Sequence, residues 1–539
     1  MKIFDKIKNF FIYTPPDENF QFSLKKDTSG AVFDVRAEKE EPPAPKISKD
    51  IEQNRKYIES RFNYPLNNDV IIRDLTLNGD IKIFLVFYDG MCNGKLINDN
   101  IIKPLLEIPL FVDEDRYDAD IILETLLTHS QSSKTCDFDS IIDNINFGCC
   151  AIFVDGIAAA FSADVKDWPH RTVDKPENEQ SIYGPQEAFA EMLRGNSAQI
   201  RKFLKTEKLI CEKTTIGNIS KTPGVIMYIS DIANEDLVNE VRRRLDGISM
   251  DYVISIEEVS MMIEDNPMMI TGHILATERP DRVARALSEG RVALVLNASP
   301  RALIFPTNAY EMTHAASDAF LRPDFANMSR LIRLIAIFIS VLLPGIFLAI
   351  TMFHEEMLPT YLLYAISASR QNVPFPSVVE LLLMEFSFEM IREAGIRMPS
   401  PIGSILGIVG GLILGQAAVG AKIVSPIMII IIAITGIGSF ATADYSLGWS
   451  HRILKLIFIL LGSSFGFFGI AMGIFIYSVL IASTTSFGIP FLSPLPGNKL
   501  YKEAVFVPPI WQTEKRPGYL KPKKDRREEK ISKKWFVGR

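Results

Sequence analysis

The 539-residue sequence has few cysteines, and none of them has the spacing of a metal site. The five are Cys92, Cys136, Cys149, Cys150 and Cys211, with no Cys-x-x-Cys pair and no His–Cys pair at ligand spacing. The adjacent pair lies in the apolar run GCCAIFVDG, where small core residues are expected. This usage argues against a metal site and favours a reducing compartment.

The sequence also lacks the short motifs of common catalytic and phosphate-binding sites. It contains no G-x-x-x-x-G-K-[ST] loop, no G-x-S-x-G and no H-E-x-x-H, and its six histidines are scattered. Its first residues, MKIFDKIKNFFIYTPPDEN, hold too short an apolar run for a secretory signal peptide. We expect a protein that is not an enzyme and needs no metal ion or cofactor. An enzyme with an unfamiliar site is the alternative.

Acidic residues dominate the first 330 residues and basic residues dominate the rest. The first part holds 38 Lys/Arg and 52 Asp/Glu, a net charge of −14, whereas residues 331–539 hold 20 and 12, a net charge of +8. An acidic soluble region argues against nucleic acid as a partner. Residues 512–539 hold 11 Lys/Arg against 4 Asp/Glu, so residues 498–539 are predicted to form a basic cytoplasmic tail facing lipid. A solvated terminus is the alternative.

Long apolar runs after residue 330 predict an all-α polytopic membrane bundle over residues 328–497. Residues 334–352, 402–419 and 423–441 are each long enough to cross a bilayer, and residues 453–483 form one tilted span or two short ones. The shorter pieces 358–368 and 378–391 are expected to be re-entrant or interfacial helices. Basic residues precede the first span, which places its start in the cytoplasm. About four full spans then return the tail to that side.

One of these runs carries glycines at every fourth position. Gly403, Gly407, Gly411 and Gly415 fall on one stripe of a helix, which in lipid allows a second helix to approach backbone to backbone. The sequence therefore predicts tight helix packing along this stripe. The partner is a second copy of the chain or, in the simpler interpretation, another helix of the same chain.

Charged residues within the membrane half are the candidates for function. Glu385, Glu389 and Arg392 recur at i, i+4 and i+7 and share one helical face. An unpaired carboxylate in lipid is costly, so these side chains must face water, a partner charge or the interface. One interpretation is an interfacial amphipathic helix with a Glu389–Arg392 pair. The other is a ring of carboxylates around a cation pathway in an oligomer.

The soluble region, residues 51–320, predicts two similar α/β lobes behind a flexible N-terminal arm, residues 1–50. Residues 93–99 match residues 234–240 at an offset of 141, and residues 148–155 match residues 290–297 at an offset of 142. In the second pair, each of the two segments is followed by another apolar strand, as in a hairpin. We therefore expect lobes at about residues 63–162 and 223–306, joined by a helical linker that contains GPQEAFAEMLRGN. Chance similarity of short apolar strands is the alternative.

Several long segments together give the chain a resemblance to a known family. These are SRLIRLIAIFISVLLPGIFLAITMFHEEMLPT, PFPSVVELLLMEFSFEMIREAGIRMPSPIGSILGIVGGLILGQAAVGAKIVSPIMIII and FGIPFLSPLPG, with YISDIANEDLVNEVRRRL and TERPDRVARALSEGRVALVLNASP in the soluble region. In them the chain resembles the A subunits of nutrient germinant receptors, the GerA-family spore germination proteins. One departure is SIYGPQEAF, with Tyr183 and Gln186 where the family commonly has arginines.

The resemblance implies a multi-pass protein of the bacterial spore inner membrane that acts with a transporter-like B subunit and a C-type lipoprotein. The soluble domain and the tail would face the cytoplasm, on the spore core side. Such A subunits are proposed to form a homo-oligomeric cation channel that converts nutrient binding into ion release. Two alternatives stay open: an A-like paralogue from a dipicolinate-channel operon, and a non-conducting scaffold or sensor for the partner subunits.

Overall fold

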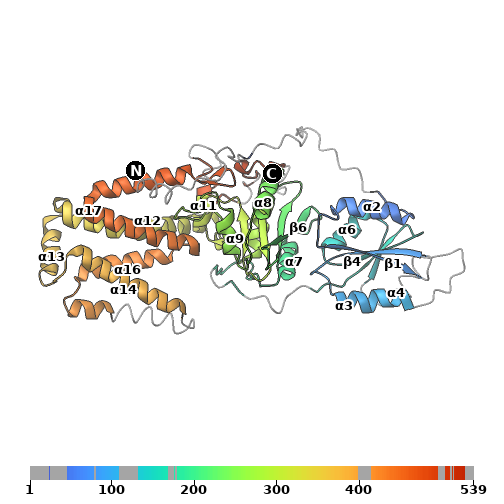
Figure 1. Cartoon of the computed structure of the whole chain (residues 1–539), viewed down its shortest axis with the longest axis horizontal. Helices are drawn as coiled ribbons and strands as arrows, with labels where there is room; N and C mark the ends of the chain where they lie inside the picture. The colour runs from blue at the N-terminus through green and yellow to red at the C-terminus, as the bar shows by residue number, and fades with distance from the viewer. Residues whose placement is uncertain are drawn as a thin grey trace, which may run out of the picture.

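Two α/β lobes and a helical bundle follow one another along the long axis of the molecule (Figure 1). The computed structural model describes residues 24, 45–77, 81–107, 132–167, 175–176, 179–397, 414–495, 504–509, 513 and 515–527. The sequence predicts this division, because the apolar runs begin where the second lobe ends. Each lobe has its own sheet and its own core.

Lobe 1 is built on a five-stranded antiparallel sheet with the strand order β1-β2-β4-β5-β3. In β2, Ile83 and Leu85 face one helical layer, whereas Phe84, Val86 and Tyr88 face the other. Burial on both faces explains why IKIFLVFY is almost continuously apolar. The elements are β1 (Val70–Leu77), β2 (Ile81–Tyr88), β3 (Ser132–Thr135), β4 (Cys150–Val154), β5 (Ala160–Ala163), α2 (Ile51–Arg61), α3 (Gly94–Ile97), η1 (Asn98–Ile102), α4 (Lys103–Glu107) and α6 (Phe138–Asn146).

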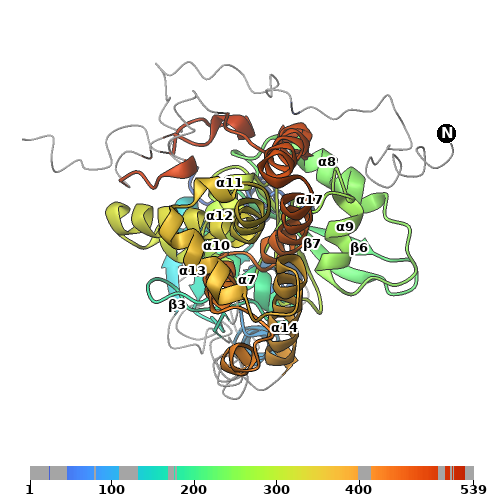
Figure 2. The ribbon, with the colours of Figure 1, turned by 90° about the vertical axis from the view of Figure 1, so that its left-hand side faces the viewer.

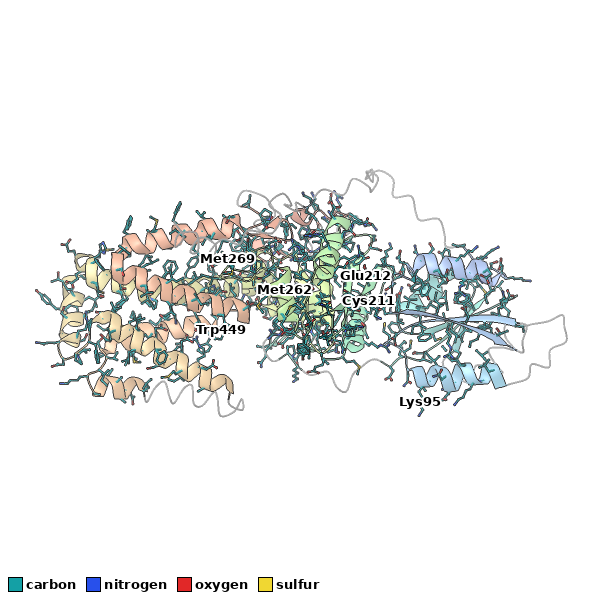
Figure 3. All side chains as sticks on the ribbon, viewed as in Figure 1. Lys95, Cys211, Glu212, Met262, Met269 and Trp449 are labelled. Atoms are coloured by element: carbon teal, nitrogen blue, oxygen red, sulfur yellow. The ribbon has the colours of Figure 1, made fainter. Side chains whose placement is uncertain are left out.

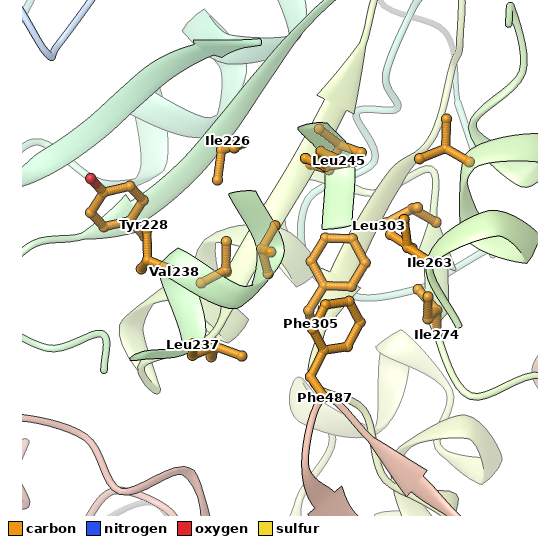
Figure 4. Close-up of a cluster of buried hydrophobic side chains, with 14 of the residues drawn as sticks. Ile226, Tyr228, Leu237, Val238, Leu245, Ile263, Ile274, Leu303, Phe305 and Phe487 are labelled. Carbon is orange, nitrogen blue, oxygen red and sulfur yellow. The ribbon is translucent and has the colours of Figure 1, made fainter. Parts of the chain in front are cut away.

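Lobe 2 repeats this arrangement with the strand order β6-β7-β9-β10-β8. Ile226 and Tyr228 face α8 and α9 in one core cluster (Figure 4). Val225 and Met227 face the opposite cluster. The elements are β6 (Leu209–Ile216), β7 (Thr222–Ile229), β8 (Leu275–Thr277), β9 (Val292–Leu296), β10 (Ala302–Phe305), α7 (Leu193–Phe203), α8 (Glu235–Asp246), α9 (Ile256–Ile263) and α10 (Pro280–Ser288).

The two sheets have the same topology, strand for strand, and β4–β5 and β9–β10 are the predicted hairpins. Two boundaries differ from the prediction. Lobe 2 begins with α7 and β6, before residue 223, and the expected helical linker is not helical between residues 184 and 192. This stretch runs along lobe 2, where Phe189 N donates to Glu278 O at 2.8 Å and Arg279 donates to Pro185 O at 2.7 Å.

A buried ion pair holds the two lobes together. The Arg201 guanidinium of α7 is 2% exposed and donates to Asp69 of lobe 1, at 2.8 Å from Oδ1. It also donates to Asn67 and stacks over Tyr88, 4.1 Å from the ring centroid. Separating the lobes would leave both charges without a partner, which is costly for buried groups. The ion pair therefore stabilises this relative position of the two lobes.

The region after lobe 2 is helical. Within the described residues, α12 (Pro323–Phe353) and the helical segment at Ser446–Ser483 are long and apolar enough to cross a membrane, and α16 (Pro426–Phe440) is a shorter apolar helix. The remaining elements are α11 (Ala309–Thr313), η3 (Ala316–Ala319), η4 (Glu355–Met357), α13 (Thr360–Arg370), α14 (Ser377–Arg397), α17 (Tyr445–Ser483), β11 (Thr485–Ser486), β12 (Ile489–Pro490) and η6 (Gly518–Leu520).

α17 consists of two antiparallel helices. This agrees with the prediction of two short spans, and not one tilted span, for residues 453–483. Gly466 breaks the helix with φ 60° and ψ −143°, a left-handed conformation that favours glycine. The returning half brings Tyr477 back beside Ser450, since both contact consecutive residues of lobe 2. Figure 1 shows the two halves side by side. Arg452 lies inside the first half, and Asp444 caps its start.

α14 runs parallel to α16 over the length of α16. Glu380 near the start of α14 accepts from Ser425 at the start of α16, and Arg392 near the end of α14 donates to Ser439 near the end of α16. The predicted short piece at residues 378–391 is therefore part of a 21-residue helix that lies within the bundle.

The described part of the basic tail packs on lobe 2. Leu520 is fully buried in the lobe 2 core, and Lys523, Lys524 and Arg527 pair with Glu235, Asp231 and Glu289. Residues 515–527 thus face the acidic surface of lobe 2 where the sequence suggested lipid. In the predicted N-terminal arm, Leu24 is buried in the lobe 2 core and Ile47 in the lobe 1 core.

Glycines let α12 and α17 cross with their backbones in contact. A Cβ on Gly462 would overlap the carbonyl oxygen of Gly345, and a Cβ on Gly345 would lie 2.5 Å from Phe458 O. A Cβ on Gly438 of α16 would lie 2.8 Å from Ala336 O of α12. This is close packing of small residues, as in membrane helix pairs, within one chain.

We predict that Gly462→Ala destabilises the bundle by about 1–3 kcal/mol, because the new methyl group must displace the α12 backbone. Gly448→Ala is the matched control on the same helix, since a Cβ there meets nothing within 4 Å. The control should be neutral or stabilising by up to ~1 kcal/mol. Thermal unfolding of the detergent-solubilised chain measures both changes, and equal effects would contradict the crossing.

Candidate functional site

The predicted carboxylate Glu385 lies in the centre of the bundle and pairs with a lysine of α17. Lys455 Nζ lies 2.6 Å from Glu385 Oε2, and both side chains are 3% exposed. The second oxygen, Oε1, is buried and has no hydrogen-bond partner among the described residues. α14 presents Glu385 to α17 because its apolar residues Leu381 and Met384 pack against the bundle core.

Glu389 and Arg392 lie one turn further along α14 and join the same group of charges. Glu389 lies 2.8 Å from Arg392, 3.7 Å from Arg452 and 3.7 Å from Lys455. The Arg392 guanidinium also packs against the rings of Phe388 and Phe440, at 4.8 and 5.0 Å from their centroids. We call Glu385, Glu389, Arg392, Arg452 and Lys455 the charge cluster.

The structure thus brings together all three predicted residues of the carboxylate face. With Arg452 and Lys455, the cluster holds three cations against two carboxylates, so both carboxylates are paired within the chain and one positive charge is in excess. Buried ionisable groups in apolar helices are expensive and mark functional sites by default. The role of Glu385 and Glu389 in an ion pathway stays a prediction.

The glycine stripe is only partly within the described residues. Gly403, Gly407 and Gly411 lie outside them. Gly415 is buried, and a Cβ there would lie 3.6 Å from Ile429 of α16, an ordinary contact. At this one position the contact lies within the chain, and close packing along the stripe stays a prediction.

Sequence reasoning missed Lys455 and the crossing glycines Gly345 and Gly462. Lys455 lies in the run RILKLIFILL, where a single lysine in an apolar helix is itself a signal for a buried partner. The G-x-x-x-G spacings at residues 462–466 and 469–473 indicated close helix contacts.

We predict that Lys455→Met destabilises the bundle by about 3–5 kcal/mol, since it leaves Glu385 buried without a partner. The double variant Lys455→Met/Glu385→Leu should recover most of this loss, because an apolar pair replaces the ion pair. Thermal unfolding of the three proteins in detergent tests the pair. A double variant as unstable as the single one would show that the two side chains do not compensate each other.

Lobe 2 is joined to the bundle by a loop and a hairpin. In the junction loop, residues 264–274, Ile270 packs against the α12–α17 core, and its carbonyl accepts from Ser450 Oγ at 2.7 Å. The Thr271 and Tyr477 hydroxyls lie 3.0 Å apart. Met269 of this loop lies at the boundary between lobe 2 and the bundle (Figure 3). Both halves of α17 therefore contact the same loop of lobe 2.

The junction hairpin, formed by β11 and β12, follows α17 directly. Its Phe487 is 1% exposed in the lobe 2 core, with its ring centroid 4.8 Å from that of Phe305 and the Arg244 guanidinium 4.2 Å above it (Figure 4). The end of α17 is thus anchored inside lobe 2. A displacement of lobe 2 must move both halves of α17.

Two titratable groups of the junction loop are buried with perturbed pKa values. Burial raises the pKa of Glu264 to about 7, although the His273 backbone N–H donates to its carboxylate at 3.2 Å. Burial lowers the pKa of His273 to about 4, and its ring packs edge-on against Phe491. Neutral forms of both groups are therefore favoured in the folded chain.

We predict that Glu264→Gln stabilises the chain more at pH 8 than at pH 5. The folded pKa of Glu264, about 7, lies above its ordinary value of 4.5, so the protonated form stabilises the folded state. The wild-type chain therefore loses stability relative to the variant as the pH rises from 4.5 to about 7. Melting temperatures of both proteins at the two pH values measure this, and a pH-independent difference contradicts it.

No group of three or more His, Cys, Asp and Glu side chains that could hold a metal ion occurs among the described residues. Tyr183, at the departure from the family pattern, is 60% exposed, and Gln186 donates to Ser181 O at 3.4 Å. The candidate site is thus the charge cluster and the junction that joins it to lobe 2. These features define a protein with duplicated α/β lobes mounted on an apolar bundle with buried charges.

Comparison with known proteins assigns the chain to a family. The family model described as Bacillus/Clostridium GerA spore germination protein matches residues 56–519. Spore germination protein KA of Bacillus subtilis (strain 168) is 35% identical over 486 residues, 89% of this chain and 88% of the relative. Spore germination protein GerLA of Bacillus cereus is 34% identical over 462 residues, which are 85% of this chain and 93% of the relative. The chain therefore belongs to the GerA family of spore germination proteins, which confirms the resemblance.

A solved structure is also similar, the N-terminal domain of the A subunit of the Bacillus megaterium spore germinant receptor GerK3. It is 26% identical, with a TM-score of 0.38, and the match covers 48% of this chain and 96% of that domain.

Proposed function

We propose that this chain is the membrane subunit of a spore nutrient germinant receptor, and that it converts germinant binding into ion release as a homo-oligomeric cation channel. Family membership supports the role in germination. The observation that carries the channel proposal is the charge cluster, because five ionisable side chains in an apolar bundle need a functional reason.

In this proposal the protein lies in the spore inner membrane, with both lobes on the cytoplasmic side. α12 leaves lobe 2 and the second half of α17 returns to it, which supports an even number of crossings. α12 and the first half of α17 run away from the lobes, whereas α14, α16 and the second half of α17 run towards them. The described tail residues lie on lobe 2 and hence on the same side.

The mechanism is a shift between a closed and an open arrangement of the bundle. In the closed arrangement Glu385 is held by Lys455 and faces no pathway. A signal from the partner subunits, a transporter-like B subunit and a C-type lipoprotein, moves lobe 2. The junction loop then shifts both halves of α17, carrying Arg452 and Lys455 relative to the carboxylates of α14. No enzymatic step is part of this function.

A non-conducting scaffold is the second candidate. The observation that favours it is the positive excess of the charge cluster, since three cations against two carboxylates do not attract a cation. In this function the chain would hold the partner subunits together while ions pass elsewhere.

Ion currents through vesicles that contain the purified chain separate the two functions. We predict that Glu385→Gln and Glu389→Gln change the conductance or the cation selectivity, because both remove a carboxylate that faces α17. Glu356→Gln, an exposed carboxylate in η4, is the matched control and should leave selectivity unchanged. Unaltered currents in both cluster variants would remove these residues from the pathway, and an absence of current in the wild-type chain favours the scaffold.

A further inference from the structure

The end of lobe 2 that faces the bundle is wider than the bundle itself. Figure 2 looks from the bundle end, and parts of lobe 2, α8 and α9 among them, extend beyond the outline of the helices. The rim of lobe 2 is therefore open to the medium that surrounds the helices. One part of this rim, beside the start of α12, exposes aromatic and aliphatic side chains.

A turn of lobe 2 and the start of α12 together form this apolar part of the rim. In the turn at residues 181–184, Ile182 is 86% exposed and Tyr183 is 60% exposed. The next residue, Gly184, lies against Phe320, since a Cβ there would be 2.6 Å from the ring carbon Cδ2. Phe320 stands two residues before the N-cap of α12. We call the exposed side chains of the turn and of the helix start the base patch: Ile182, Tyr183, Phe320, Phe325 and Met328.

Buried contacts hold both halves of the base patch in place. Asp318 is 1% exposed and pairs with Arg330 and Arg333 of α12, which fixes the segment that carries Phe320. On the side of the turn, Arg279 donates to Pro185 O at 2.7 Å. The apolar side chains are thus presented to the surroundings by an ordered framework.

The base patch continues the exposed apolar face of α12. After Phe325, the exposed residues Met328, Ile332 and Ile335 follow at spacings of three and four residues, which places them on one side of the helix. α12 has 31 residues, and at ~1.5 Å per residue it is about 46 Å long. A bilayer measures about 40–45 Å with its headgroups. A helix of this length therefore has its first turns at the level of the headgroups.

Arg285 of α10 adds a positive charge to the base patch. Its exposed side chain lies over Phe320, with the guanidinium carbon 5.7 Å from the ring centroid. Within the described part of the chain it forms no ion pair. Aromatic rings beside an arginine are typical of the membrane interface, where the ring lies among the glycerol groups and the guanidinium reaches the phosphates.

We propose that the base patch inserts into the headgroup layer of the membrane and that Arg285 contacts an anionic phospholipid. Continuity with the apolar face of α12 favours lipid as the occupant, and so does the positive charge, because the cytoplasmic leaflet is anionic. Lobe 2 is then held against the membrane surface in addition to its covalent links to α12 and α17. The proposal rests on the proposed function only for the placement of the bundle in a membrane, and it does not require ion conduction.

Site-specific photocrosslinking of the full chain tests this contact. Ile182 and Tyr183 are replaced one at a time by the photoreactive residue p-benzoylphenylalanine, and each chain is reconstituted into vesicles of phosphatidylglycerol and phosphatidylethanolamine. After irradiation, mass spectrometry of the peptides identifies what has become attached. We expect phospholipid adducts at both positions, above the level of samples that were not irradiated.

Two further probe positions serve as controls. Met192 lies further along the same stretch and is 68% exposed, but it stands near Arg194, which pairs with Asp89 of lobe 1. It therefore faces away from the bundle, and a probe there should give no lipid adduct. Phe338, 58% exposed in the middle of α12, should give a lipid adduct whenever the bundle lies in the membrane.

The pattern of adducts separates this proposal from the proposed function. Adducts at position 338 but not at positions 182 and 183 overturn the base-patch proposal and leave the bundle in the membrane. An absence of lipid adducts at all three positions overturns both. Attachment of position 182 or 183 to a peptide of a second copy of the chain assigns the patch to a subunit interface and also overturns the proposal.

A second measurement tests the choice of lipid. With the probe at position 183, vesicles of phosphatidylglycerol and phosphatidylcholine should give mainly phosphatidylglycerol adducts. Arg285→Gln should lower their yield by up to about fivefold, the factor that corresponds to one basic residue at an anionic surface. Arg73→Gln, at an exposed position in lobe 1, is the matched control and should leave the yield unchanged. Equal yields with Arg285 and with Gln at this position overturn the assignment to an anionic lipid.

Discussion

The chain leaves lobe 2 to form the bundle and must come back to complete the same lobe. Phe487, which follows the last helix, and Leu520, which lies in the tail, are both buried in the core that Phe305 and Leu237 also build. Lobe 2 therefore reaches its full core only when residues that follow the bundle pack into it. This constraint brings the end of α17 and the described tail residues back to lobe 2.

The bundle combines two kinds of contact with opposite demands. Where α12 crosses α17, glycines bring the backbones together and leave no room for side chains. Where α14 meets α17, the contact is made by charged side chains, with Lys455 2.6 Å from Glu385 and 3.7 Å from Glu389. Close apolar packing resists change, whereas Lys455 has two carboxylates within reach. The movement in the proposed mechanism is therefore between α14 and α17.

The sequence predicted the lobes because strands buried on both faces leave a strong pattern. The duplication at an offset of 141 was found in residues 93–99 and 234–240, which follow the apolar strands IKIFLVFY and TPGVIMYI. The first strand of lobe 2, β6, was not predicted, because its sequence LICEKTTI is polar over half its length. Five residues also separate β6 from β7, two more than separate β1 from β2, so the offset between the first strands of the lobes is 139.

The candidate site was only half predictable. A helical periodicity placed Glu385, Glu389 and Arg392 on one face, but nothing local assigns Lys455, 70 residues away, as the partner of Glu385. The basic tail was ambiguous for a similar reason, since positive charge is attracted equally by anionic lipid and by an acidic protein surface. In the structure the burial of Leu520, beside Lys521, places this part of the tail on the acidic surface of lobe 2.

The Arg201–Asp69 contact has a mechanical consequence. Because this desolvated pair and its neighbours join the two sheets, lobe 1 and lobe 2 are expected to move as one body. A force on lobe 1 would then reach the loop and the hairpin that contact α17, far from where it was applied.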